Sequence, residues 1–193
     1  LFDNECIIYG IGMEEIDEKI SPMVEKYYNV DLAKEWPDLP EIDAVIHLAG
    51  LAAVGPSFDR PHAYIDINSA IVTNMAEYYL RQNKKPRLVI ISSGAIYDPH
   101  TPMPISEESP IAFTSPYTVS KILVENQATY YRSRGLDCVV MRPFNHIGPG
   151  QLPGFLLPDL AEKINSRSGS DDPISVGNLE TKRDYTDVRD VVR

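Results

Sequence analysis

The chain has 193 residues, of which 43% are hydrophobic and 24% charged, and its 28 Asp and Glu outnumber its 18 Lys and Arg, giving a formal net charge of −10. This composition is that of a soluble globular protein long enough to bury one hydrophobic core, as one domain or as a domain with a small appendage. The charge argues against nucleic acid or an anionic membrane as the main partner, because both bind basic surfaces, and leaves room for a small anionic ligand where cations are local.

The sequence also bears on targeting and on the state of the two cysteines. No apolar stretch approaches membrane-spanning length, and the first residues lack a basic-then-apolar leader pattern. Cys6 and Cys138 lie in apolar runs without the paired spacing of a zinc site or a disulfide framework, so we expect two buried free thiols and no metal. These features predict a cytoplasmic protein.

Short apolar runs provide the strand predictions. Residues 5–11 and 27–32 are two weaker strand patterns, separated by a polar stretch at 12–26 without an apolar stripe. Three stronger runs follow at 44–49, 88–93 and 138–142. Each is too short for a core helix and rich in β-branched residues, so each predicts a strand buried on both faces of a sheet.

Helical patterns lie between the strong runs. Residues 62–83 have helical periodicity and end before Lys84-Lys85-Pro86. Ser115 and Pro116 predict the start of a second helix and Gly135 its end. A short helix is expected at 155–164 and a polar loop at 166–172. Alternation of strand and helix predicts the α/β class, with a doubly wound parallel sheet.

Ligands of such sheets bind outside the carboxyl ends of the strands, so the residues after each strong run are candidate site residues. Tyr117 and Lys121, four residues apart near a helix start, share one helix face. An ammonium near a phenol lowers the tyrosine pKa and improves proton transfer near neutrality. Ser93, at the end of the second run, would hold a substrate oxygen beside that phenol. Alone, this spacing is a weak pattern among 11 tyrosines and also fits an exposed pair on a solvated helix.

The order of six motifs over about residues 44–193 resembles the extended short-chain dehydrogenase/reductase family of nucleotide-sugar enzymes. The motifs are His47-Leu48-Ala49-Gly50, Asp66-Ile67-Asn68-Ser69, Ser92-Ser93-Gly94-Ala95-Ile96-Tyr97, Tyr117-Thr118-Val119-Ser120-Lys121, Arg142-Pro143-Phe144-Asn145-His146-Ile147-Gly148-Pro149-Gly150 and Arg183-Asp184-Tyr185-Thr186-Asp187-Val188. The resemblance implies a partial Rossmann-like dinucleotide-binding domain at 1–150 and the beginning of a substrate-binding region at 151–193.

Catalytic roles follow from the resemblance. Tyr117 would be the general acid/base, Lys121 would hold the nicotinamide ribose and lower the tyrosine pKa, Ser93 would orient the reacting oxygen, and Asn68 would support the proton relay. The cofactor would be NAD or NADP, lined by Asp31, Leu32, Leu48, Ala49, Gly50, Leu51, Ser92 and Pro143 together with Tyr117 and Lys121. A nucleotide-diphosphate sugar would meet Ser93, Gly94, Ala95, Asn145 and Arg183. Lys121, Arg142 and Arg183 are the local cations for these anions.

Several of these residues have a plainer interpretation. Asn68 would equally satisfy buried backbone, Asp31 would serve in a turn, and Arg183 would be a surface cation. His47 lies within an apolar strand pattern, which favours a hydrogen-bonded core histidine over a catalytic one.

The residues after Ser93 narrow the reaction. Dehydratases of this family carry acidic residues there, whereas Gly94 and Ala95 cannot transfer a proton. A reductase or an epimerase remains. Residues 144–155 and 177–185 look most like GDP-4-keto-6-deoxymannose reductases, which reduce the 4-keto group of a GDP-linked 6-deoxyhexulose, while 47–55 also looks like UDP-galactose 4-epimerases. A non-catalytic nucleotide-sensing module is a third hypothesis.

One departure from the family concerns the pyrophosphate. The sequence has no Gly-x-x-Gly-x-x-Gly turn. The pair Gly10 and Gly12 is followed by Glu14 and Glu15, whose carboxylates would repel a pyrophosphate. Acidic residues at this position weakly favour NAD over NADP as the cofactor. We therefore expect a chain that starts near the family's second strand, with an unpaired sheet edge and uncovered apolar surface. Alone it should bind the dinucleotide weakly and be inactive, whereas the full-length protein should be a homodimer.

Overall fold

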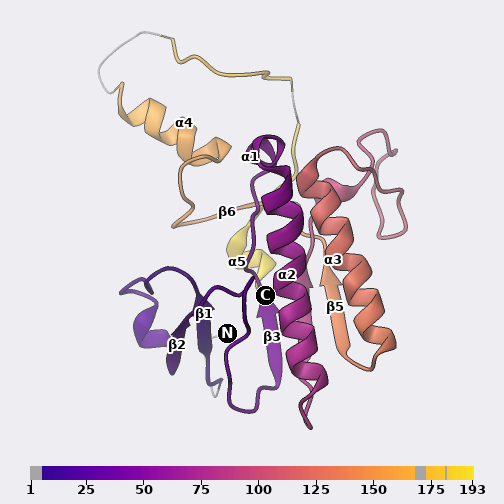
Figure 1. Ribbon diagram of the computed structural model, residues 1–193. Helices are drawn as coiled ribbons and strands as arrows, with labels where there is room; N and C mark the ends of the chain where they lie inside the picture. Colours follow the sequence, from indigo (N-terminus) through magenta and orange to yellow (C-terminus); the bar gives the residue numbers. More distant parts are fainter. Residues whose placement is uncertain (1–5, 168–172, 181) are drawn as a thin grey trace. The chain divides into compact units, whose positions relative to one another are not determined.

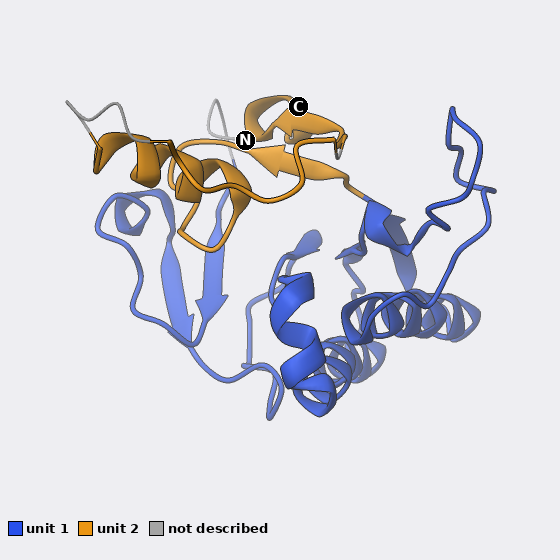
Figure 2. Ribbon diagram, turned by 90° about the horizontal axis from the view of Figure 1, so that it is seen from above, with its two compact units in different colours: residues 1–142 blue, residues 143–193 orange. Residues whose placement is uncertain are grey.

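The computed structural model describes residues 6–167, 173–180 and 182–193, in two compact units, Leu1–Arg142 and Pro143–Arg193 (Figure 2). The division into compact units falls between Arg142 and Pro143, and the strand at 145–147 pairs with a strand near the end of the chain. Most of the loop expected at 166–172, and the start of the strand expected at 5–11, lie outside the described residues.

Unit 1 contains parallel strands connected through helices (Figure 1). Its elements are β1 (Tyr9–Gly12), the 3₁₀ turn η1 (Ser21–Met23), β2 (Lys26–Asn29), β3 (Ala44–His47), α1 (Val54–Asp59), α2 (Pro61–Leu80), β4 (Arg87–Ile91), the 3₁₀ turn η2 (Gly94–Ile96), α3 (Pro116–Ser133) and β5 (Asp137–Met141). One parallel sheet has the order β3–β4–β5, and β1 pairs with β2 in a second parallel sheet. The predicted α/β class with parallel strands is confirmed.

Among the described residues of unit 1, helices cover one face of the β3–β4–β5 sheet. Helices α2 and α3 pack against each other on that face (Figure 1), where Leu88, Ile90 and Cys138 are buried. The alternate residues Ile46 and Met141 are 51% and 42% exposed. The prediction of strands buried on both faces is therefore wrong for the described chain, because the alternation of the pleat leaves every second side chain without a covering helix.

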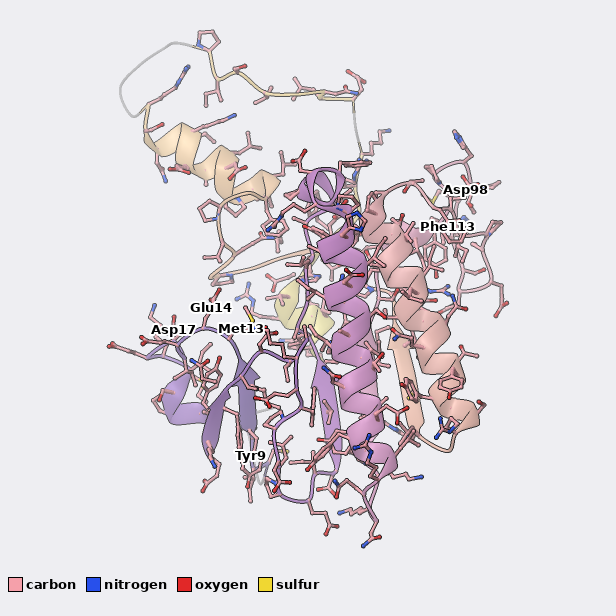
Figure 3. The ribbon with its side chains drawn as sticks, viewed as in Figure 1. Tyr9, Met13, Glu14, Asp17, Asp98 and Phe113 are labelled. Carbon is pink, nitrogen blue, oxygen red and sulfur yellow. The ribbon has the colours of Figure 1, made fainter. Side chains whose placement is uncertain are left out.

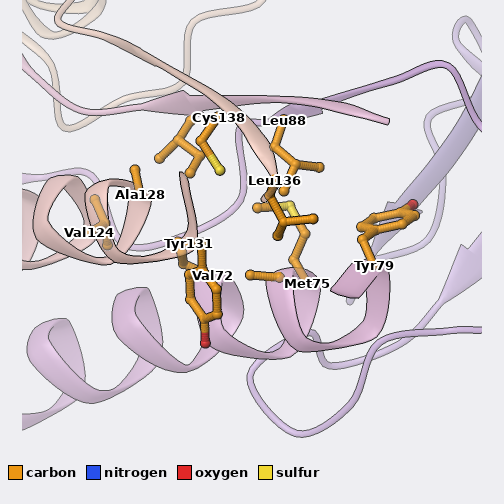
Figure 4. Close-up of a cluster of buried hydrophobic side chains, with 11 residues drawn as sticks. Val72, Met75, Tyr79, Leu88, Val124, Ala128, Tyr131, Leu136 and Cys138 are labelled. Atoms are coloured by element: carbon orange, nitrogen blue, oxygen red, sulfur yellow. The ribbon is translucent and has the colours of Figure 1, made fainter. Parts of the chain in front are cut away.

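The core of unit 1 is the interface between this face and the two helices (Figure 4). Val72, Met75 and Tyr79 from α2 meet Leu88 from β4, and α3 and β5 add the remaining side chains. The remaining buried members are Ala76, Ile90, Val124, Ala128, Tyr131, Leu136 and Cys138. Cys138 is thus a buried free thiol as predicted, whereas Cys6 is exposed, because it precedes β1 and packs under no helix.

Helix α3 begins and ends at the predicted residues. The Ser115 side chain accepts a hydrogen bond from the Thr118 amide, and the Thr118 hydroxyl accepts one from the Ser115 amide, forming a capping box. Pro116 occupies the first helical turn, and Gly135 follows the helix with a φ of +90°, a conformation that favours glycine. This capping fixes where Tyr117 and Lys121 lie on the helix.

Unit 2 contains β6 (Asn145–Ile147), α4 (Leu156–Asn165), β7 (Tyr185–Asp187) and α5 (Val188–Val191). Strands β6 and β7 are parallel, with Asn145 opposite Tyr185. Helix α4 confirms the helix expected at 155–164. Throughout the part of the chain that the structure describes, no helix combines the length and apolar character needed to span a membrane.

Leu88→Ala should lower the free energy of unfolding by about 2–5 kcal/mol, because the Leu88 side chain is fully buried and its removal leaves a cavity. Leu179→Ala is the matched control, since Leu179 is 80% exposed and should change stability by less than about 0.5 kcal/mol. Denaturant unfolding of both variants checks this, and equal effects would contradict the packing described.

Candidate functional site

Three side chains predicted to act together meet at the carboxyl end of β4. Ser93 follows β4 and caps η2, and its hydroxyl lies close enough to the phenol of Tyr117 on α3 to act on the pKa of that phenol. One helical turn further on, the Lys121 ammonium donates to the Ile91 carbonyl at 2.9 Å and lies 5.9 Å from the centroid of the Tyr117 ring. The packing of α3 over the sheet therefore places a hydroxyl, a phenol and an ammonium at one strand end.

A second tyrosine orients the phenol. The Tyr64 ring on α2 packs edge-on against the Tyr117 ring, with 6.4 Å between centroids and an interplanar angle of 84°. Both side chains are buried. Sequence reasoning missed Tyr64, although its position one helical turn before Asn68 places the two on the same face of α2.

Burial sets the titration of this group. It raises the pKa of Tyr117, and the neighbouring Ser93 hydroxyl opposes this rise only in part. Burial also lowers the pKa of Lys121 from 10.5 to about 8. The Tyr117 shift is opposite to the lowering expected from Lys121, because desolvation of the phenolate outweighs the favourable interactions. The phenol is therefore the protonated form at neutral pH.

Asn68 joins the loop after β3 to α3. Its Oδ1 accepts from the Leu51 amide at 2.8 Å, and its Nδ2 donates to the Leu51 carbonyl at 3.2 Å and to the Ser120 hydroxyl at 3.0 Å. Ser120 in turn donates to the Tyr117 carbonyl at 2.7 Å. Gly50 has a φ of +132°, and a Cβ there would come within 2.6 Å of the Asn68 Oδ1. Asn68 thus satisfies buried backbone, and its part in a proton relay stays a prediction.

The buried rim of the strands holds polar groups without partners. Among the described residues, the two ring nitrogens of His47 have no hydrogen-bond partner. The Ser92 hydroxyl has none either. The hydrogen-bonded core histidine expected at position 47 is therefore not found. Burial, with the charge of Lys121 as a smaller cause, lowers the pKa of His47 to about 4, so the imidazole is neutral. Among the described residues, the Ser92 hydroxyl is therefore a buried hydrogen-bond donor without an acceptor, directly before Ser93 in the sequence.

The remaining residues predicted to line the cofactor have varied surroundings. Asp31 accepts from the Ala33 amide at 3.1 Å and pairs with Lys34, which lowers its pKa and fits a turn residue. The buried Leu32 is tied to α2 through its carbonyl. Leu48 is 76% exposed, whereas Ala49 is half-buried. Glu14, after β1, is among the residues labelled in Figure 3.

The predicted substrate residues divide between the two units. Gly94 is buried, and the amide of the exposed Ala95 donates to the Ser93 hydroxyl at 3.1 Å. Asn145 and Arg183 belong to unit 2, as does Pro143, which was predicted to line the cofactor. The Asn145 side-chain Nδ2 donates to the Asp184 carbonyl at 3.4 Å, and Arg183 is exposed. Within unit 2, Asn145 and Arg183 therefore lie on or beside the paired strands β6 and β7.

Arg142 does not serve as the free cation expected from the sequence. Its guanidinium forms a bidentate ion pair with Glu125. A carboxylate on a neighbouring helix, which the strand motif cannot reveal, therefore neutralises it. Lys121 remains without a carboxylate partner among the described residues.

Comparison with known proteins matches residues 25–193 to the model of the NAD dependent epimerase/dehydratase family. The chain belongs to this family. It is 35% identical over 162 residues to GDP-6-deoxy-D-mannose reductase of Pseudomonas aeruginosa, covering 81% of this chain and 53% of that protein. It is 30% identical over 194 residues to UDP-glucose 4-epimerase of Dictyostelium discoideum, covering 91% and 55%.

Solved structures agree with this membership. The structure of RMD from Pseudomonas aeruginosa complexed with NADPH matches with a TM-score of 0.73 at 34% identity, covering 83% of this chain and 56% of that one. The chain spans about half the length of the relatives it matches.

The described residues fit the nicotinamide end of a dinucleotide. Hydrogen-bond donors at the strand ends come from Lys121, Tyr117 and the unpartnered Ser92 hydroxyl. Asn68 binds the Leu51 backbone, and Gly50 beside it has no side chain that would separate the backbone from a ligand. The sequence offers no glycine-rich turn for the pyrophosphate. The fit is therefore to the ribose and nicotinamide end of such a cofactor.

Burial of the Lys121 ammonium should make stability depend on pH. Because its folded pKa of about 8 lies below the ordinary 10.5, the unfolded chain binds more protons between these values and stability should rise with pH across them. Lys121→Met should therefore stabilise the free protein at neutral pH by about 3 kcal/mol and flatten this rise. Denaturant unfolding at neutral and alkaline pH measures both effects.

The matched control is Lys85→Met, because Lys85 is exposed. This variant should keep the wild-type pH dependence. A Lys121→Met protein that is less stable than wild type at neutral pH would contradict the assignment.

Proposed function

We propose that the natural protein is a nucleotide-sugar oxidoreductase that reduces the 4-keto group of a GDP-linked 6-deoxyhexulose. The observation that carries the proposal is the gathering of the Ser93 hydroxyl and the Tyr117 phenol beside Lys121 at the end of β4. Gly94 and Ala95, which follow Ser93, have no side chain able to transfer a proton, and this weighs against a dehydratase.

The proposed chemistry divides between the cofactor and the chain. A nicotinamide dinucleotide, NAD or NADP, supplies hydride when it is bound in its reduced form, and Lys121, Tyr117, Ser92 and the backbone at 49–51 would hold its ribose and nicotinamide end. Ser93 donates a hydrogen bond that orients the carbonyl oxygen of the sugar. Tyr117 donates its proton to that oxygen as the alcohol forms.

The protonation of Tyr117 favours the reductive direction. A reductase needs a proton donor at the start of the reaction, and burial raises the pKa of Tyr117, which keeps the phenol protonated. An epimerase must first remove a proton from a sugar hydroxyl, which calls for a phenolate. The 35% identity to a GDP-6-deoxy-D-mannose reductase supports the same choice of substrate. Asn145 and the exposed Arg183 would approach the sugar nucleotide, with Arg183 offering charge to the diphosphate.

The natural full-length protein, given GDP-4-keto-6-deoxymannose and reduced nicotinamide cofactor, should oxidise one cofactor per sugar reduced. Tyr117→Phe should lower kcat by about 100- to 10,000-fold with cofactor binding largely kept, because only the transferable proton is lost. Cofactor absorbance and a binding titration measure the two quantities.

Tyr130→Phe is the control on the same helix, because Tyr130 is 52% exposed. It should keep wild-type kcat. Absence of cofactor oxidation with the wild-type protein would reject the reductase.

The second candidate is a nucleotide-sugar 4-epimerase. It is favoured by the 30% identity to a UDP-glucose 4-epimerase over 91% of this chain. Under it, an epimerised sugar forms without net cofactor turnover. A non-catalytic nucleotide-sensing module would instead bind cofactor tightly, unaffected by Tyr117→Phe, and turn over no nucleotide sugar.

A further inference from the structure

The side chain of Arg142, just after β5, makes four hydrogen bonds beside the candidate site. Its Nε and Nη2 donate to the two carboxylate oxygens of Glu125 at 2.9 and 2.7 Å. Its Nη1 donates to the Tyr97 hydroxyl at 3.1 Å and to the Glu107 carbonyl at 2.9 Å. The guanidinium also lies 5.2 Å from the centroid of the Tyr97 ring. Both charged side chains are largely buried, with 23% and 14% of Arg142 and Glu125 exposed.

These partners belong to the two segments that carry the reactive hydroxyls. The loop 98–114 connects the turn of Ser93 to the start of α3, and Asp98 and Phe113, labelled in Figure 3, mark its two ends. The Ala112 amide donates to the Ile96 carbonyl at 2.8 Å and the Asp98 amide to the Pro110 carbonyl at 2.9 Å, which closes the base of the loop. Arg142 binds this loop through Glu107 and the end of the turn through Tyr97.

The other side of the contact is α3 itself. Tyr117, Lys121 and Glu125 follow one another at four-residue intervals along this helix. Glu125 therefore anchors Arg142 to the helix that presents Tyr117. A planar guanidinium can serve a carboxylate, a hydroxyl and a carbonyl at once, whereas a lysine ammonium cannot reproduce the bidentate fork.

We propose that Arg142 is a positioning residue, which holds the turn 93–97 and the loop 98–114 on α3 so that the Ser93 and Tyr117 hydroxyls keep their placement relative to each other. The catalytic consequence rests on the proposed function. The positioning itself does not, because it concerns contacts among residues of unit 1 alone.

The test uses the natural full-length protein and the variants Arg142→Lys and Glu125→Gln. Both should lower kcat for the keto sugar by about 10- to 100-fold, as expected for a small misplacement of reactive groups, while cofactor affinity stays at the wild-type value. In hydrogen exchange, the amides of residues 94–112 should exchange about tenfold faster, and those of β4 and β5 should not change.

The matched control is Arg87→Lys. Arg87 and Asp137 form an ion pair of 2.7 Å where β4 and β5 begin, at the end of the sheet away from Ser93. Both side chains are more than half exposed. This variant should keep wild-type kcat and exchange. A folded Arg142→Lys protein with wild-type kcat would overturn the inference, and so would a uniform acceleration of exchange across unit 1.

Failure of the two proposals can be told apart. If the wild-type protein does not turn over the keto sugar, the proposed function fails and hydrogen exchange alone decides the role of Arg142. Acceleration confined to 94–112 then supports the positioning role, and unchanged or uniform exchange rejects it.

Discussion

The buried amide of Asn68 is the constraint on which the candidate site depends. A polar group in a protein interior is tolerated only where its hydrogen bonds are satisfied, and this side chain meets that requirement by binding both backbone groups of Leu51 and the hydroxyl of Ser120. The loop after β3 and the first turns of α3 therefore cannot shift independently. Gly50 is part of the same constraint, because any side chain there would displace the amide.

The electrostatics of the site differ from those of the whole molecule. The chain carries ten more acidic than basic side chains, yet Lys121 lies near the Tyr117 ring without a carboxylate partner among the described residues. Burial disfavours both the ammonium and the phenolate. An anionic ligand next to Lys121 would compensate the cost of its charge. The site is therefore suited to negative ligands through one local cation.

Local patterns in the sequence predicted much of this arrangement. Ser115, Pro116 and Gly135 predicted the bounds of α3, and the motif order predicted that Ser93, Tyr117 and Lys121 would meet. Contacts between distant segments were not predictable in the same way. The pairing of Arg142 with Glu125 and the packing of Tyr64 on Tyr117 depend on how α2 and α3 lie on the sheet. The direction of the Tyr117 pKa was missed because spacing reveals a neighbouring charge but not the extent of burial.

The closed base of the loop 98–114 has an evolutionary consequence. Hydrogen bonds between its two ends, at Ile96 with Ala112 and at Asp98 with Pro110, keep the distance between its anchor points independent of what lies between them. Side chains of the tip can therefore change while the two ends of the loop stay together, provided that the Glu107 carbonyl still reaches Arg142.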